Sequence, residues 1–230
     1  MYKVIAAALA VANAVDVAEF TEDNSVEPNA TYGVDISQLL SVSTGQCLKN
    51  AGYNHVIVRG YCSYGAVDSN VCSSLKNAQA AGITTRDVYM FPCPTCSSSA
   101  ASQVNALVSY LTNNCNSAWT KKIWLDIEGT QYWYSNTTTN RSWYQALKDA
   151  CVSHSGVSCG VYSSYYQWQG IFGSISYAYG SNLPLWYAHY DNSKIWSDFS
   201  AFGGWSTPAA KQYNGDQYVC GMGVDLDMFR

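Results

Sequence analysis

The chain has 230 residues, of which 48% are hydrophobic and only 12% are charged. This composition excludes an intrinsically disordered protein and is typical of a chain with a substantial hydrophobic core. Sixteen acidic side chains outnumber twelve basic ones, and the formal charge of −4 gives no electrostatic support for nucleic-acid binding.

The first 30 residues differ in composition from the rest of the chain. Lys3 precedes an apolar run, and Ala12-Asn13-Ala14 has the small residues of a cleavage site, so residues 1–14 are predicted to be a secretory signal peptide. The run is too short to span a membrane. Residues 15–30 hold five acids and no base, which predicts a linker or pro-segment before a single domain over residues 31–230. We expect a protein that is secreted, or held in the lumen of a lysosome-like or phagosomal vesicle, and not bound to a membrane.

Nine cysteines fit an oxidising compartment, in which most should form disulfides. Because nine is odd, at least one is expected to be free or to pair with another chain. Cys93 and Cys96 form a C-x-x-C pattern, which we interpret as a local disulfide or part of two bridges, with a redox motif as the alternative. Three sequons, at Asn29, Asn136 and Asn140, predict exposed loops that accept glycans in a eukaryotic source.

Strand-like and helix-like patterns alternate from Tyr32 onward. Gly52 and Gly82 follow the first two helical patterns and predict their ends. Beyond residue 172 the helical signal fades, and the strand-like runs are joined by loops rich in Gly, Ser and Asn. The predicted strands are residues 32–36, 55–60, 84–91, 122–128, 158–162, 185–188, 210–213 and 223–227, and the predicted helices are residues 43–51, 71–81, 99–113, 141–152 and 165–172.

This alternation predicts an α/β fold with mainly parallel strands. Eight strands favour a closed, TIM-like barrel that has lost the helices of its last three units, because the length is near the low end for such barrels. A doubly wound open sheet is the alternative. No G-x-G-x-x-G or P-loop follows a strand, which weakens nucleotide-binding forms of that alternative.

The fourth predicted strand carries two acids, Asp126 and Glu128, in an otherwise apolar run. Side chains i and i+2 of a strand share a face, with Cα atoms ~6.6 Å apart at a rise of about 3.3 Å per residue. Like charges at this range predict that one pKa rises while the other stays low. Such a pair offers a proton donor and an anion side by side, whereas the alternative is that both acids end a strand and face water.

Further acids lie near the ends of the first and last predicted strands and should converge on this pair, because barrel active sites lie at the carboxyl ends of the strands. Asp35 lies in the first strand and Asp225 in the last. Asp227 shares a face with Asp225 and is expected to add negative potential to the mouth or to sit at its rim. Two carboxyl groups across a cleft are the usual equipment for cleaving a glycosidic bond. The residues expected to bind substrate around these acids are Tyr89, Phe91, Tyr162, Trp186, Tyr190 and Gln212, with core packing as the alternative for the aromatic ones.

Four motifs in chain order carry a more specific signal. They are Tyr32-Gly-Val-Asp35-Ile-Ser37, Trp124-Leu-Asp126-Ile-Glu128, Leu185-Trp-Tyr-Ala-His-Tyr190 and Gly223-Val-Asp225-Leu-Asp-Met-Phe229. With these motifs the chain resembles glycoside hydrolase family 25, the Chalaropsis-type lysozymes, and particularly secreted invertebrate or protist members. The chain differs from the commoner Asp-Leu-Asn ending by having Asp227.

The resemblance implies a barrel of five β/α units followed by three strands, (β/α)5(β)3. It also implies hydrolysis of the β-1,4 bond between N-acetylmuramic acid and N-acetylglucosamine in peptidoglycan, for bacterial digestion or antimicrobial defence. By position, Glu128 would be the general acid and Asp126 an anion that orients the substrate 2-acetamido group. Asp35 and Asp225 would line the subsite and stabilise developing positive charge.

We expect a monomer that binds peptidoglycan and needs no cofactor or metal, since no zinc spacing or calcium loop is present. Two other functions remain open from the sequence. One is a chitinase-like hydrolase of N-acetylglucosamine polymers, and the other is a non-catalytic carbohydrate-binding protein of the same fold.

Overall fold

The computed structural model describes residue 27 and residues 29–230. The predicted signal peptide and most of the predicted linker lie outside this part of the chain, within which no helix is both long and apolar enough to cross a membrane. The strands are β1 Thr31–Ile36, β2 Tyr53–Cys62, β3 Ala66–Val67, β4 Thr85–Met90, β5 Lys122–Asp126, β6 Ser158–Ser163, β7 Leu185–Ala188, β8 Ala210–Val219 and β9 Met222–Phe229. The helices are α1 Val42–Asn50, α2 Val71–Ala80, α3 Ala100–Cys115, α4 Thr137–Val152 and α5 Tyr165–Phe172, with a 3₁₀ turn η1 at Thr130–Tyr132.

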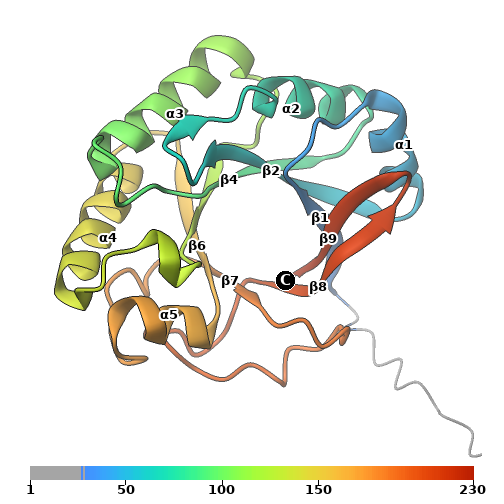
Figure 1. The fold of residues 1–230 in the computed structure, drawn as a ribbon. Coiled ribbons are helices and arrows are strands. Elements are labelled where there is room, and N and C mark those ends of the chain that lie inside the picture. Colours follow the sequence, from blue (N-terminus) through green and yellow to red (C-terminus); the bar gives the residue numbers. More distant parts are fainter. Residues whose placement is uncertain (1–26, 28) are drawn as a thin grey trace, which may run out of the picture.

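Eight strands close into a barrel in the order β1-β2-β4-β5-β6-β7-β8-β9, and β9 pairs back onto β1 (Figure 1). A helix follows each of the first five barrel strands, whereas β7, β8 and β9 are joined without one, among the residues that the structure describes. The predicted α/β barrel of five β/α units and three terminal strands is therefore confirmed, and the open sheet is wrong. The pairs from β1 through β8 are parallel, and only β9 runs antiparallel to both of its neighbours.

Helix α4 begins earlier than the sequence predicted because Asn136 caps it. The Asn136 side-chain oxygen accepts hydrogen bonds from the backbone N–H groups of Thr138 and Thr139, at 2.9 and 3.0 Å. The sequon at Asn140 consequently lies inside the helix, and the prediction of an exposed loop there is wrong. The Asn140 side chain is buried and donates to the backbone oxygens of Tyr134 and Ile171, both at 2.9 Å.

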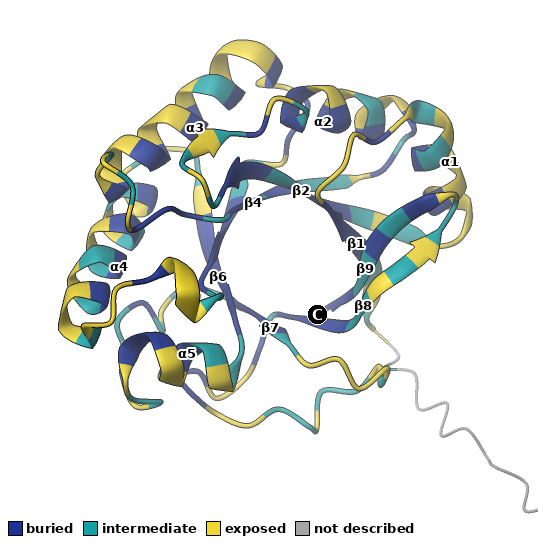
Figure 2. Cartoon of the chain, in the orientation of Figure 1, coloured by how far each residue is buried: buried dark blue, intermediate teal, exposed yellow. Residues whose placement is uncertain are grey.

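The buried residues form two layers, one between the barrel and its helices and one inside the barrel. Figure 2 shows the strands mostly buried and the helices exposed on their outward faces. Inside the barrel, the ring of Trp124 packs against Gly160 so closely that an added Cβ would lie 2.4 Å from the ring. The inner layer packs beneath the polar site at the barrel mouth. It consists of Ile57, Trp124, Tyr162, Trp186, Ala210 and Phe229.

Eight cysteines form four disulfides, and Cys62 is free and buried. Cys93 and Cys96 pair with each other, so the C-x-x-C pattern is a local disulfide. The other pairs are Cys47–Cys220, Cys72–Cys115 and Cys151–Cys159. The Cys47–Cys220 bridge ties the β8–β9 turn to α1 and thereby fixes one wall of the barrel mouth.

Candidate active site

One cavity of about 100 Å³ lies inside the barrel mouth. It is lined by the four acids and six other residues that the sequence singled out. The structure therefore brings together every predicted site residue, although their roles remain predictions. The lining residues are Asp35, Tyr89, Phe91, Asp126, Glu128, Tyr162, Trp186, Tyr190, Gln212 and Asp225.

Glu128 lies just past the end of β5, where the backbone is held on both sides. The indole N–H of Trp133 donates to the Glu128 backbone oxygen at 3.0 Å. The next residue, Gly129, has φ +66°, a conformation that favours glycine, and its N–H donates to the Gln167 side chain at 3.0 Å. This turn directs the half-buried Glu128 carboxyl into the same cavity as Asp126, although the strand itself ends at Asp126.

Gln212 connects the acids to the aromatic wall. Its side-chain oxygen accepts hydrogen bonds from the hydroxyls of Tyr162 and Tyr190, at 2.6 and 2.7 Å. Its amide nitrogen donates to one carboxylate oxygen of Asp35 at 2.6 Å and one of Asp225 at 3.1 Å. Since all hydrogen-bonding groups of this amide are used, Gln212 fixes four side chains around the cavity.

Burial and mutual repulsion raise the pKa values of the acids in this cavity. Burial raises the pKa of Glu128, and the charge of Asp225 raises it further. Burial also raises the pKa of Asp126 well above its usual range, with additional effects of Glu128 and Asp35. The expectation that Asp126 keeps a low pKa is therefore wrong for the free protein. The alternation of a strand predicts which face a side chain lies on, but not how deeply the side chain is buried.

Asp126 and Asp227 each have a buried carboxyl oxygen that accepts no hydrogen bond from the described residues, namely Oδ1 of Asp126 and Oδ2 of Asp227. When neutral, Asp227 can donate a hydrogen bond to the Asp35 carboxylate. The other oxygen of Asp227 accepts from the indole N–H of Trp186 at 2.9 Å. Asp227 is fully buried, so its predicted place at the rim is wrong. Burial, and then the charge of Asp35, raises the pKa of Asp227 well above its usual range and favours the neutral acid.

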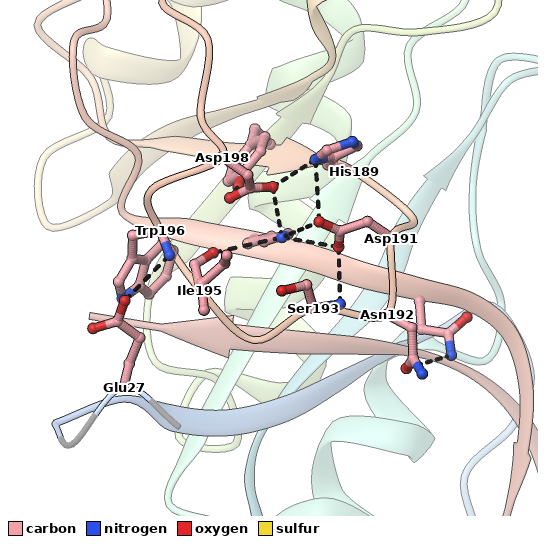
Figure 3. Close-up of polar contacts among 11 residues, drawn as sticks. Glu27, His189, Asp191, Asn192, Ser193, Ile195, Trp196 and Asp198 are labelled. Carbon is pink, nitrogen blue, oxygen red and sulfur yellow. Dashed lines mark hydrogen bonds and ion pairs between the residues drawn. The ribbon is translucent and has the colours of Figure 1, made fainter. Parts of the chain in front are cut away.

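A second polar cluster lies beside the mouth, on the loop that follows β7 (Figure 3). His189, Asp191 and Asp198 approach closely enough to resemble a metal site. However, the buried ammonium of Lys211 already lies between the two carboxylates, at 2.9 Å from Asp191 and 2.7 Å from Asp198. These residues form an ion-pair network that holds the loop carrying Tyr190, with lysine as its cation.

The sequence analysis did not identify Asp216 or Gln167. Each makes a hydrogen bond between a backbone N–H group and a side chain that helps to position the site. The backbone N–H of Asp216 donates to Asp225 at 2.7 Å, and Gln167 accepts from Gly129. Both lie outside the four motifs, in a hairpin and a short helix whose contact with the mouth depends on the folded structure. No pattern in the sequence signals either contact.

A closed β/α barrel with clustered carboxyls and aromatic walls is typical of barrel glycoside hydrolases. The family described as "Lysozyme-like protein 1" matches residues 26–213. "Probable GH family 25 lysozyme 2" of Dictyostelium discoideum is 46% identical over 87% of this chain and 92% of its own. "Lysozyme-like protein 5" of Caenorhabditis elegans is 40% identical over 88% of this chain and 93% of its own. A muramidase structure from Trichobolus zukalii superposes with a TM-score of 0.68 at 26% identity, covering 87% of this chain and 93% of the other.

The chain therefore belongs to the family 25 lysozymes, which are glycoside hydrolases. The resemblance seen in the four sequence motifs is confirmed.

Proposed function

We propose that the protein is an N-acetylmuramidase that cleaves the β-1,4 bonds of peptidoglycan, with Glu128 as general acid. The observation that carries the proposal is the arrangement of Glu128 and Asp126 in one cavity, with Glu128 half-buried at the mouth and Asp126 below it. The names of the relatives support lysozyme activity.

Glu128 is suited to keep its proton at a higher pH than an ordinary glutamate because burial and the charge of Asp225 raise its pKa. In the first step, this proton passes to the glycosidic oxygen and the bond to the leaving sugar breaks. The oxygen of the 2-acetamido group of the retained sugar attacks the anomeric carbon and closes a ring. Water then opens the ring, and the Glu128 carboxylate takes the proton that the water releases.

Asp126 would act on the acetamido group. The Asp126 side chain lines the cavity, and its Oδ1 accepts no hydrogen bond from the described residues, so this carboxyl has the capacity to accept one from a ligand. The acetamido N–H is a suitable donor, and a hydrogen bond to the carboxylate favours the ionised form and lowers the pKa that burial has raised. Substrate binding would thus create the orienting anion that the free protein disfavours.

Asp35 and Asp225 would stabilise the positive charge that develops at the anomeric carbon. Burial, and then the charge of Asp225, raises the pKa of Asp35, and burial is also the main cause that raises the pKa of Asp225. Only Asp35 and Asp225 receive hydrogen bonds from the Gln212 amide, which favours their ionised forms. The pKa of the buried Asp35 is nevertheless raised well above its usual range, whereas that of the half-buried Asp225 is raised less, so Asp225 holds negative charge more readily than Asp35.

We further propose that the protein acts as a secreted or vesicle-lumen monomer on bacterial cell walls, without a metal or cofactor. The four disulfides support an oxidising compartment. Peptidoglycan is the expected partner, in bacterial digestion or antimicrobial defence.

A direct test compares hydrolysis of purified peptidoglycan with hydrolysis of chitin oligomers, by wild type and Glu128→Gln. We expect wild type to favour peptidoglycan, and the variant to lose at least about a hundredfold in rate on either polymer, as removal of a general acid does. Asp149→Asn, a change of an exposed acid on α4, is the matched control and should keep full activity. Wild-type preference for chitin, or an active Glu128→Gln enzyme, would contradict the proposal.

A further inference from the structure

Exposed tyrosines gather around the barrel mouth. Eight large hydrophobic side chains are exposed in the described part of the chain, and five of them are tyrosines that line the inner cavity or the cavities beside it. Scattered exposed apolar residues need no explanation, but a group around one opening does. The five are Tyr64, Tyr132, Tyr166, Tyr190 and Tyr218.

The inner cavity is too small to hold a substrate alone. Its volume of about 100 Å³ is well below the roughly 300–1,000 Å³ of common small-molecule sites. A cavity of about 280 Å³ adjoins it on one side, sharing Asp35 and Asp225 and lined further out by Tyr218. A cavity of about 230 Å³ adjoins it through Glu128 and reaches Tyr166. The carboxyls therefore lie in the middle of a longer cleft.

Tyr218 and Tyr166 mark opposite ends of this cleft. Tyr218 lies near the tip of the β8–β9 hairpin and Tyr166 in the first turn of α5, and these elements lie on opposite sides of the barrel opening (Figure 1). The two residues are 79% and 82% exposed, so neither contributes much to the core. The hairpin that carries Tyr218 is tied to α1 by the Cys47–Cys220 disulfide, which restrains the backbone beside this residue.

The side chains beside both tyrosines have the chemistry of a sugar site. Besides the acids, amide and hydroxyl side chains line the same cavities, namely Gln38 and Gln217 in the cavity of Tyr218, and Ser164 and Gln167 in the cavity of Tyr166. Such groups exchange hydrogen bonds with sugar hydroxyls, while a tyrosine ring offers a flat apolar face for the C–H face of a pyranose. No lysine or arginine lines either of these two cavities, so a neutral polysaccharide backbone fits better than an anionic chain.

We propose that Tyr218 and Tyr166 are stacking platforms at the two ends of an extended glycan site. The protein then binds a β-1,4-linked N-acetylhexosamine segment longer than the two sugars that flank the cleaved bond. For the cleavage of such a segment, this inference rests on the proposed function. It adds the expectation that the substrate is a long glycan. Long glycan strands should be better substrates than short oligosaccharides because only they reach both rings.

The test compares Tyr166→Ala, Tyr218→Ala and the double variant on two substrates, uncrosslinked peptidoglycan strands and the shortest cleavable oligosaccharide. We expect each single change to raise KM for the strands about fivefold and the double change about 25-fold, with kcat and the short substrate unaffected. Tyr134→Ala is the control, because Tyr134 is 39% exposed and lines none of these cavities. An unchanged KM on strands, or an equal loss on both substrates, would overturn the inference.

Binding measurements separate this inference from the proposed function. Glu128→Gln is titrated with the strands and with N-acetylglucosamine hexamers, with and without the two tyrosine substitutions. Binding that depends on Tyr166 and Tyr218 supports the platforms even if wild type fails to cleave peptidoglycan. Normal cleavage with binding that is independent of both rings rejects the platforms and leaves the proposed function intact.

Discussion

Replacing Gln212 with methionine tests whether this amide organises the site. The substitution keeps the volume and removes the four hydrogen bonds to Tyr162, Tyr190, Asp35 and Asp225. Tyr190 and Asp225 are partly exposed, so water can replace their lost partner. Asp35 and Tyr162 are buried, and we estimate about 2 kcal/mol for the bond to the carboxylate and about 1 kcal/mol for the bond to the hydroxyl.

Gln212→Met should therefore lower the free energy of unfolding by about 3 kcal/mol, measured by urea denaturation with tryptophan fluorescence. The loss should shrink as pH falls, because the amide stabilises the Asp35 anion, and a protonated Asp35 gains less from it. Gln145→Met, on a partly exposed glutamine of α4 that donates only to the Tyr177 hydroxyl, is the control and should lose less than about 1 kcal/mol. Equal losses in the two variants, or a loss independent of pH, would refute the assigned role of Gln212.

Two further predictions concern stability and pH. Burial raises the pKa of Asp227, so ionising it costs free energy in the folded state, and stability due to this group falls as pH rises above about 4. The Tm of Asp227→Asn should exceed that of wild type by a margin that widens from pH 4 to pH 8, and a constant margin would contradict this. Although burial raises the pKa of Asp198, hydrogen bonds led by that from Lys211 lower it to about 2. The stability that ionised Asp198 contributes is present above about pH 4 and is lost as pH falls toward 2. The acid-induced fall in Tm should therefore be smaller in Asp198→Asn than in wild type. An equal fall in the two proteins would contradict this role of Asp198.

Much of the barrel could be predicted because its strands and helices differ in apolar period. The antiparallel direction of β9 could also have been predicted from the sequence. The predicted strands 210–213 and 223–227 are separated by nine residues, fewer than the dozen or more that a parallel crossover needs. The structure closes this hairpin with Cys220 and Gly221 at φ +54° and +77°, as a type I′ turn requires. Cysteine is uncommon in this conformation, which hid the turn signal in the sequence.

The sequence could not predict how deeply individual side chains are buried or which residues far apart in the chain contact each other. Lys211 and Gln212 are neighbours in β8 and point to opposite faces, one toward the loop 189–198 and the other into the barrel. Lysine is rarely fully buried, and only the folded loop shows why Lys211 is. Alternation likewise placed Asp227 beside Asp225 but gave no sign that it lies beneath the site, where Trp186 binds it.

The identity of the sugar at the newly formed reducing end tests the central claim most directly. Purified peptidoglycan is digested with wild type and with Glu128→Gln, the fragments are reduced with borohydride, and their ends are identified by mass spectrometry. A muramidase that uses Glu128 as its acid gives reduced N-acetylmuramic acid with wild type and no new ends with the variant. Reduced N-acetylglucosamine, or the same ends from Glu128→Gln at a similar rate, would contradict the account.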